Sequence, residues 1–213
     1  AGSAIVERLL GGESCALVTD AGTPAISDPG EDLVRLCAEN GVEVRAIPGC
    51  CAAVNALAVS GLPTGRFTFE GFLTVNKKSR REHLNSLKGE TRTMIFHEAP
   101  HKLRTTLNGL TEAFGPDRRI SLCRELTKLH EEVLRFTLAE AVAYYEENAP
   151  KGEYVLVVAG AAPKTGAVVT LEDGVAQVLA LKEQGMRLKD AAKEVAEHTG
   201  LSKNELYAAA LER

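Results

Sequence analysis

Long apolar runs are missing from this 213-residue chain: none approaches the roughly 18 residues that a membrane-spanning helix needs. The basic-then-apolar pattern of a secretory signal peptide is missing from its start as well. Hydrophobic residues make up 45% of the sequence and charged residues 25%, which is typical of a globular protein with a real core. We therefore expect a soluble, cytoplasmic protein without a membrane segment.

Cysteine pairs and an excess of basic charge are lacking too. The five cysteines are an odd number, and none lies in a C-x-x-C pair, so we expect reduced and mostly buried thiols. The formal net charge is −4. This value argues against a generally basic nucleic-acid-binding protein, although a local basic patch is compatible with it.

The amino terminus lacks a methionine. The chain starts Ala-Gly-Ser at a short helical segment that leads directly to an apolar run at 15–18. Because a parallel α/β domain rarely begins in this way, we expect an N-terminally truncated chain.

A polar loop at 19–30 follows that apolar run, which we interpret as a buried strand, and precedes a helical pattern at 31–40. Its glycines and prolines fix the backbone, and its Asp and Ser side chains can bond to nearby amides. Such a loop at the carboxyl end of a strand is where ligands bind in open α/β sheets. An ordinary turn is the alternative.

A second loop, 48–53, follows a predicted strand at 42–47 and opens a helix of small residues that runs through Val59. Strand, helix and strand imply a right-handed parallel crossover, so the two loops should lie side by side. The small residues allow the start of the helix to approach either a packed neighbour or a ligand.

The rest of the chain reads as a hinge at 61–65, a second α/β segment, a linker at 161–170 and a helical unit. Expected strands are 66–72, 92–97, 119–123, 132–136 and 154–159; expected helices are 103–114, 137–147, 171–184, 188–198 and 202–211. The last three helices suit a helix-turn-helix unit. Residues 171–213 carry six bases and eight acids, which favours a packing or docking module over an independent nucleic-acid binder.

Basic residues gather in one short stretch at 76–83. A solvated helix face is the usual explanation of such a run. It is also the best candidate for contact with phosphate, because no other segment has so large an excess of basic over acidic residues. The candidate RNA-binding residues are Lys77, Lys78, Arg80 and Arg81.

The stretch His97-Glu98-Ala99-Pro100-His101 matches H-E-x-x-H, a zinc-protease pattern that requires both histidines on one helix face. Pro100 disfavours a helix at Ala99, and the preceding apolar residues put His97 at a strand end. We therefore expect no metal, and we place Pro100 at the start of the following helix.

Several motifs together resemble one known group of enzymes. They include Asp-Ala-Gly-Thr-Pro-Ala-Ile-Ser-Asp-Pro-Gly at 20–30 and Pro-Gly-Cys-Cys-Ala at 48–52, with further matches at 60–63, 71–73, 97–103 and 124–128. The chain is similar over nearly its whole length to the tetrapyrrole-methylase superfamily. Within it, the similarity is to the branch that uses S-adenosylmethionine to methylate a ribose 2′-hydroxyl, that of a cytidine, in small-subunit (16S) ribosomal RNA.

The resemblance implies a two-domain α/β fold, that of a class III S-adenosylmethionine-dependent methyltransferase, with a C-terminal helix-turn-helix-like unit. The divisions would be 1–63, 66–160 and 171–213. It also implies a cofactor between the two α/β domains, small-subunit ribosomal RNA as partner, and a homodimer. The implied cofactor-binding residues are Ala21, Gly22, Thr23, Pro24, Ile26, Cys51, Ala52, Glu98 and Leu126.

Two departures from the pattern matter. The second loop has Cys51 where the family usually has serine, so a weak thiol replaces a hydroxyl donor. The family's first strand and its glycine-containing loop are not in the sequence, so we expect weak cofactor binding and little activity.

No catalytic base stands out in the sequence. Glu125 and Lys128 are the weak candidates, and ion pairing with Arg124 explains them equally well. Two other functions stay open: methylation of a small tetrapyrrole, and a nonenzymatic RNA- or ribosome-binding module.

Overall fold

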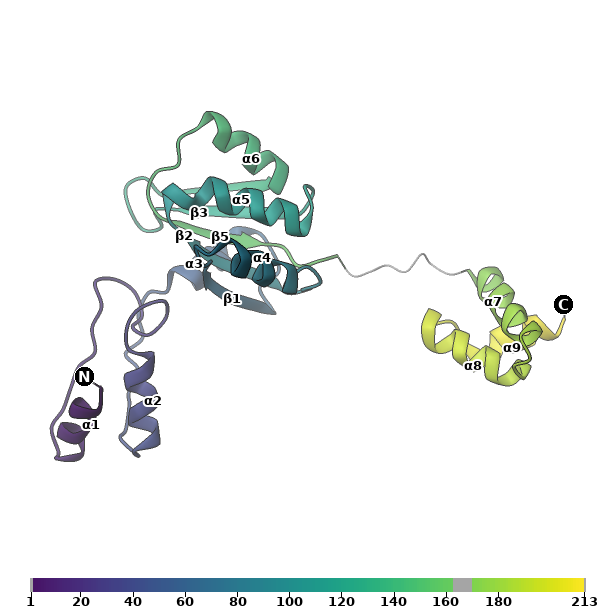
Figure 1. Cartoon of the computed structure of the whole chain (residues 1–213), viewed down its shortest axis with the longest axis horizontal. Coiled ribbons are helices and arrows are strands. Elements are labelled where there is room, and N and C mark those ends of the chain that lie inside the picture. The colour runs from purple at the N-terminus through teal and green to yellow at the C-terminus, as the bar shows by residue number, and fades with distance from the viewer. Residues whose placement is uncertain (1, 163–169, 213) are drawn as a thin grey trace. The chain divides into compact units, whose positions relative to one another are not determined.

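The computed structural model describes residues 2–162 and 170–212 and divides into two compact units, 1–161 and 162–213. The first unit is a mixed α/β structure, and the second is helical (Figure 1). The expected further division of the first unit near residue 63 stays a prediction.

A five-stranded sheet forms the centre of the first unit. Its order is β1 (Phe67–Phe72), β2 (Thr93–Glu98), β5 (Tyr154–Val158), β3 (Arg119–Arg124) and β4 (Glu132–Thr137). β1 pairs with β2 in parallel, and the other neighbours are antiparallel. All five residues of β5 are buried, because this central strand is covered on both faces.

Helices cover both faces of this sheet. On one face lie α4 (Lys77–Ser86), α5 (Pro100–Phe114) and α6 (Leu138–Glu147), whose apolar residues share a core with Phe96 and Leu156. On the other lies α3 (Ala52–Ser60), which packs across β2, β5, β3 and β4. The expected strands from 66 onward and the helices beside them are confirmed.

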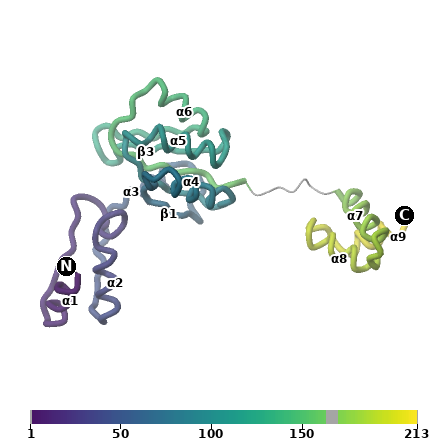
Figure 2. Tube along the Cα trace, viewed as in Figure 1, coloured from purple at the N-terminus to yellow at the C-terminus, as the bar shows by residue number. Residues whose placement is uncertain are grey.

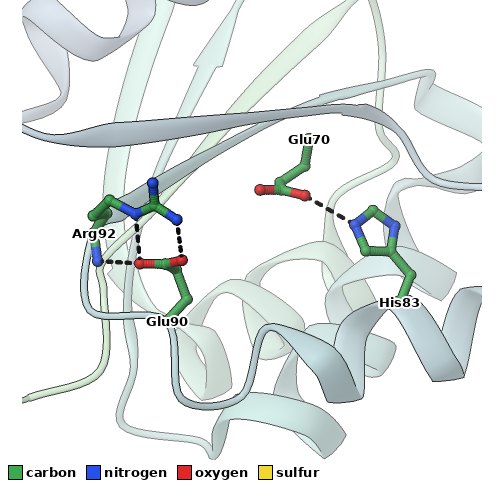
Figure 3. Close-up of polar contacts among 4 residues, drawn as sticks. All are labelled: Glu70, His83, Glu90 and Arg92. Carbon is green, nitrogen blue, oxygen red and sulfur yellow. Dashed lines mark hydrogen bonds and ion pairs between the residues drawn. The ribbon is translucent and has the colours of Figure 1, made fainter.

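Two acid–base contacts fix α4 and the turn that follows it (Figure 3). His83 of α4 lies 2.9 Å, Nε2 to Oε2, from the carboxylate of Glu70 in β1. In the turn between α4 and β2, Arg92 donates from Nε and Nη2 to the two carboxylate oxygens of Glu90. Leu84 is buried beneath the helix. The helix α4, which carries the basic run, is thereby held against the sheet.

The N-terminal part contains two helices, α1 (Gly2–Leu10) and α2 (Glu31–Glu39), which lie side by side (Figure 2). The predicted strands at 15–18 and 42–47 are wrong, and so is the crossover between them: neither segment joins a ladder in the described part of the chain. Val18 and Ile47 are 80% and 84% exposed. A strand needs neighbouring strands for its hydrogen bonds, and an isolated pair of strands is only marginally stable in water. An apolar sequence pattern is therefore not sufficient for a sheet here.

The expectation of mostly buried cysteines also needs correction. Cys37 and Cys123 are buried, Cys51 is half-buried, and Cys15 and Cys50 are exposed; all five are free thiols.

The second unit contains α7 (Leu171–Glu183), α8 (Leu188–Thr199) and α9 (Lys203–Leu211), as predicted. The unit has its own core, in which Val178, Ala191 and Leu206 are fully buried. The hydroxyl of Ser202 accepts the amide of Glu205 and caps α9. The expected linker at 161–170 falls largely outside the described residues. Within the described ranges, no helix is both long and apolar enough to span a bilayer.

Candidate functional site

The two loops that sequence analysis singled out meet in the structure. The hydroxyl of Thr23 donates a 2.9 Å hydrogen bond to the carbonyl of Cys50. Gly22 lies beside the same carbonyl: its φ is +83°, and a Cβ built there would be 3.7 Å from the Cys50 oxygen. The expectation that these loops lie side by side is confirmed, although the strands that were to carry them are not formed.

The backbone of the first loop is both fixed and open. Ala25 and Ser27 have φ of 67° and 60°, a left-handed conformation that residues other than glycine seldom adopt. Within the described residues, the amides and carbonyls of 19–29 make no backbone–backbone hydrogen bond. The carbonyl of Ala21 accepts the hydroxyl of Thr19, and the amides of this loop are therefore the groups available to a ligand.

The start of α3 lies at the second loop and also has open amides. Cys51 is the N-cap residue, and its side chain makes no capping hydrogen bond. A thiol is a weak acceptor, so the first-turn amides of α3 lack the partner that serine would provide. A helix start of this kind suits an anionic group such as a carboxylate.

The first loop also reaches the end of β1. The pairing of β1 with β2 is irregular between Phe69 and Gly71, and Gly71 has a φ of +62°. A Cβ built on Gly71 would lie 3.9 Å from the hydroxyl oxygen of Ser27. The loop 19–30, the start of α3 and the end of β1 therefore form one neighbourhood, which we call the loop site.

The side chain of Glu98 is directed away from the loop site. Glu98 is buried, and its carboxylate accepts the hydroxyl of Thr106 in α5 and the amide of Ala99. It thus lies on the α5 face of the sheet. Its assignment as a cofactor-binding residue stays a prediction, which can rest only on its backbone.

His97 occupies the opposite face, and sequence reasoning missed it as a site residue. Its ring lies 5.1 Å from that of Phe69 and 5.4 Å from that of Phe72, and its Nε2 is buried without a hydrogen-bond partner. Burial lowers the pKa of His97, partly offset by the carboxylates of Asp28 and Glu153. Alternation from the apolar residue Ile95 would have placed His97 on the α3 face.

Glu125 and Lys128 are tied to each other in the loop after β3. Lys128 Nζ lies 3.0 Å from Glu125 Oε1 and 2.9 Å from Glu153 Oε2. The pKa of Glu125 is lowered, first by the amide of Glu153 and then by Lys128, and the pKa of Lys128 is raised by both carboxylates. Both shifts oppose a role as general base near neutral pH. Arg124 pairs with Glu132 at 3.2 Å rather than with either of them.

Leu126, in the same loop, packs with Cys51 against the core cluster on the α3 face. The structure thus brings Thr23 to the loop that precedes α3, and it places Cys51 and Leu126 against the same core cluster on the α3 face. The carboxylate of Glu98 lies on the other face of the sheet.

The basic run lines a hollow of about 410 Å³ between α4 and α5. Lys78 is 3.9 Å from Glu82, whereas Lys77, Arg80 and Arg81 make no ion pair with any described residue. Basic side chains at the start of a helix oppose its dipole, so local stability does not account for them. The lining residues are Lys77, Lys78, Arg80, Arg81, Leu84, Asn85, Gly109, Glu112 and Ala113.

The H-E-x-x-H spacing has no helical geometry. His97 lies in β2, which ends at Glu98, Pro100 occupies the first turn of α5 as predicted, and His101 follows it. In the portion that the structure describes, no three His, Cys, Asp or Glu side chains are grouped to hold a metal ion.

A sequence model described as tetrapyrrole (corrin/porphyrin) methylases matches residues 1–142, more than half of the chain. The chain belongs to the tetrapyrrole methylase family. The RsmI C-terminal HTH domain matches residues 169–213 of this family member, which covers the second unit. The predicted fold class is confirmed.

Relatives of this tetrapyrrole methylase are similar along almost its entire length. A Synechocystis protein named ribosomal RNA small subunit methyltransferase I is 45% identical over 208 residues, which are 98% of this chain and 75% of the relative. A protein of the same name from Escherichia coli O157:H7 is 42% identical, over 98% of this chain and 73% of its own.

Solved structures show the same fold at lower identity. The methyltransferase CobJ matches with a TM-score of 0.57 and 22% identity, over 78% of this chain and 72% of that one. Uroporphyrin-III-C-methyltransferase from Thermus thermophilus matches with a TM-score of 0.51 and 21% identity, over 75% and 71%.

Proposed function

We propose that this tetrapyrrole methylase is an S-adenosylmethionine-dependent enzyme that methylates small-subunit (16S) ribosomal RNA, at the 2′-hydroxyl of a cytidine. The observation that carries the proposal is the 42–46% identity to proteins named ribosomal RNA small subunit methyltransferase I, over 95% or more of the chain. The similarity includes the helical unit at 169–213.

The loop site fits the cofactor. The open amides at 19–29 and at the start of α3 can bind polar groups of S-adenosylmethionine, and the missing side chain of Gly22 leaves room beside the Cys50 carbonyl. S-adenosylmethionine supplies an activated methyl group when bound. The proposed cofactor-binding residues are Ala21, Gly22, Thr23, Pro24, Ile26, Cys51, Ala52, Leu126 and the backbone of Glu98.

The protein's remaining task is to align a hydroxyl with that methyl group and to exclude water. Glu125 and Lys128 are occupied by each other and by Glu153, so we assign them to loop stability rather than to proton transfer. Lys77, Lys78, Arg80 and Arg81 are the proposed phosphate contacts of the RNA, because three of them have no competing ion pair among the described residues.

Methylation of a tetrapyrrole is the second candidate, favoured by the fold shared with uroporphyrin-III-C-methyltransferase. Methyl transfer from labelled S-adenosylmethionine should be measured on isolated small ribosomal subunits, free ribosomal RNA and a porphyrinogen. We expect label in the ribosomal substrates alone. Label in the porphyrinogen alone would overturn the RNA assignment, and binding of subunits without any transfer would favour a nonenzymatic ribosome-binding module.

The loop site itself is tested by Gly22→Val. The bulkier residue is strained at a φ of +83° and fills the space beside the Cys50 carbonyl, so cofactor affinity should fall about tenfold in calorimetry. Gly41→Val is the matched control: its φ is +69°, and a Cβ there meets nothing within 4 Å. Equal affinity of the two variants would mean that the pocket lies elsewhere.

We also propose that the enzyme is a homodimer, as the family resemblance implies, and that it is cytoplasmic, because its proposed ribosomal substrate is located there. Light scattering on the purified chain should give twice the 22.8 kDa monomer mass. A monomer mass at micromolar concentration would contradict this assembly.

A further inference from the structure

Three phenylalanines on the edge strand β1 are exposed on the face that carries α3. In the register of the sheet, Phe67, Phe69 and Phe72 pair with Thr93, Ile95 and His97. The irregularity at Gly71 returns Phe72 to the same face as Phe69, since both rings contact His97. Phe69 and Phe72 are 39% and 56% exposed, because α3 packs on the other four strands. Exposed aromatic rings in such a group mark a binding surface.

The histidine that two of these rings contact has a buried polar atom without a partner in the described part of the chain. The planes of Phe69 and Phe72 stand at 73° and 76° to the His97 ring, so both meet it edge to face. His97 Nε2 is buried and has no hydrogen-bond partner among the described residues. A buried polar atom without a partner costs stability, so a partner supplied by a ligand would compensate for it.

Unpaired cations follow the rings along the chain. The basic helix α4 starts at Lys77, five residues after Phe72. Lys77, Arg80 and Arg81 make no ion pair in the described part of the protein. Aromatic rings that stack on bases, together with cations that bind phosphates, are how proteins bind single-stranded nucleic acid. The helix α4 packs on the face of the sheet opposite to the rings, so a strand of RNA that contacts both would pass the edge strand β1.

We propose that Phe69, Phe72 and His97 form a nucleobase-binding subsite, in which an unpaired RNA base stacks on Phe72 and accepts or donates a hydrogen bond at His97 Nε2. Phe69 contacts the same imidazole edge to face. The subsite rests on the proposed function and deepens it, since it gives the RNA a base contact in addition to the phosphate contacts proposed on α4. Ser27 of the loop site lies beside Gly71, so the bound nucleotide is next to the cofactor loop.

Binding of two fluorescently labelled probes to the full chain tests the subsite: an oligocytidylate hexamer and an abasic ribose–phosphate hexamer of equal charge. Stacking of one base on an aromatic ring accounts for roughly tenfold in affinity, so the wild type should prefer oligocytidylate by about that factor. Phe72→Ala should abolish the preference and leave the affinity for the abasic hexamer unchanged. The salt dependence of binding should also stay the same, because no phosphate contact is lost.

Two further variants keep the test independent of folding defects. The chain has no tryptophan, so Phe72→Trp introduces a single fluorophore; it should retain the preference, and oligocytidylate should quench its emission. Phe67→Ala removes another exposed ring, 42% exposed against 56% for Phe72, from the same strand and face. Phe67 makes no ring contact with His97 among the described residues, so this variant should behave as wild type. His97→Leu should weaken oligocytidylate binding several-fold and leave abasic binding intact.

The outcomes separate the subsite from the proposed function. Equal, salt-dependent binding of both hexamers by the wild type would overturn the subsite and leave RNA binding in place. Binding of neither hexamer would overturn both. A Phe72-dependent affinity for uroporphyrin III, or a dimer that dissociates in Phe72→Ala, with no preference between the hexamers, would assign the rings to another occupant and contradict the proposal.

Discussion

At the scale of single residues, backbone strain gathers in two loops. Among the described residues, the non-glycine positions with positive φ are Ala25 and Ser27 in one loop and Glu125 and Thr127 in another. Such conformations cost about 1–3 kcal/mol each and persist where the surroundings demand them. The first pair lies in the loop site, and Leu126 stands between the second pair, so both loops are fixed where ligand contact is proposed.

Thr127→Gly tests this strain. Thr127 is exposed and has a φ of 65°, so glycine should relieve the strain and raise the free energy of unfolding. We expect a gain of about 1 kcal/mol in urea denaturation, after allowing for the greater chain entropy of glycine. Thr105→Gly, at an exposed position inside α5, should instead lose roughly 0.3–0.5 kcal/mol, because glycine is a poorer helix former than threonine. A loss at both positions would mean that Thr127 is not strained.

A second residue-scale prediction concerns the buried carboxylate of Glu98. Thr106→Val removes the hydroxyl that donates to it, and a buried acceptor left unsatisfied costs about 1–3 kcal/mol. Urea denaturation should show that loss. Thr105→Val, at the exposed neighbouring position of the same helix, should leave the free energy of unfolding nearly unchanged. An equal loss in both variants would mean that the hydrogen bond to Glu98 is not the cause.

His97 shows what residue patterns can and cannot predict. The sequence places it near a strand end, and the alternation of side chains along a strand puts His97 and Glu98 on opposite faces of the sheet. Which of the two side chains faces the loop site depends on which face of the sheet carries α3. That placement follows from packing across distant strands rather than from the local sequence pattern. The positions with positive φ could not be predicted from the sequence either, because alanine, serine, glutamate and threonine do not favour a left-handed conformation.

At the scale of helices and strands, hydrophobic periodicity predicts an element correctly where tertiary packing buries the same residues. The stripe Leu103, Leu107, Leu110 and Phe114 predicts α5, and all four residues are buried. The apolar runs 15–18 and 42–47 carry an equally clear pattern, yet they form no strands. A helix makes its own hydrogen bonds, whereas a strand depends on neighbours that the pattern does not reveal.

The turn between α4 and β2 supports a prediction of pH dependence. Arg92 lowers the pKa of Glu90 to about 2, first through its side-chain hydrogen bonds and then through its amide. A depressed carboxylate pKa stabilises the fold above the unfolded pKa of about 4.5, and this contribution is lost as the pH falls toward 2. Glu90→Gln should therefore lower stability at pH 7 and flatten the decline below pH 4.5 in urea titrations. An unchanged acid slope would contradict this origin.

At the scale of the whole molecule, the two units have separate cores. Val178 is fully buried within the second unit, so Val178→Asp should unfold α7–α9. Calorimetry should then lose one transition while cofactor binding by residues 1–161 persists. Loss of both transitions together would show that the units are thermodynamically coupled.

The position of β5 has a consequence for synthesis on the ribosome. β5 is the last strand of the sheet in sequence but its middle strand in space, with β2 on one side and β3 on the other. The halves β1–β2 and β3–β4 share no ladder until residues 154–158 emerge and are inserted between them. A nascent chain stalled before Tyr154 thus exposes two unpaired edges and is vulnerable to aggregation, a hazard that ends with five residues of translation.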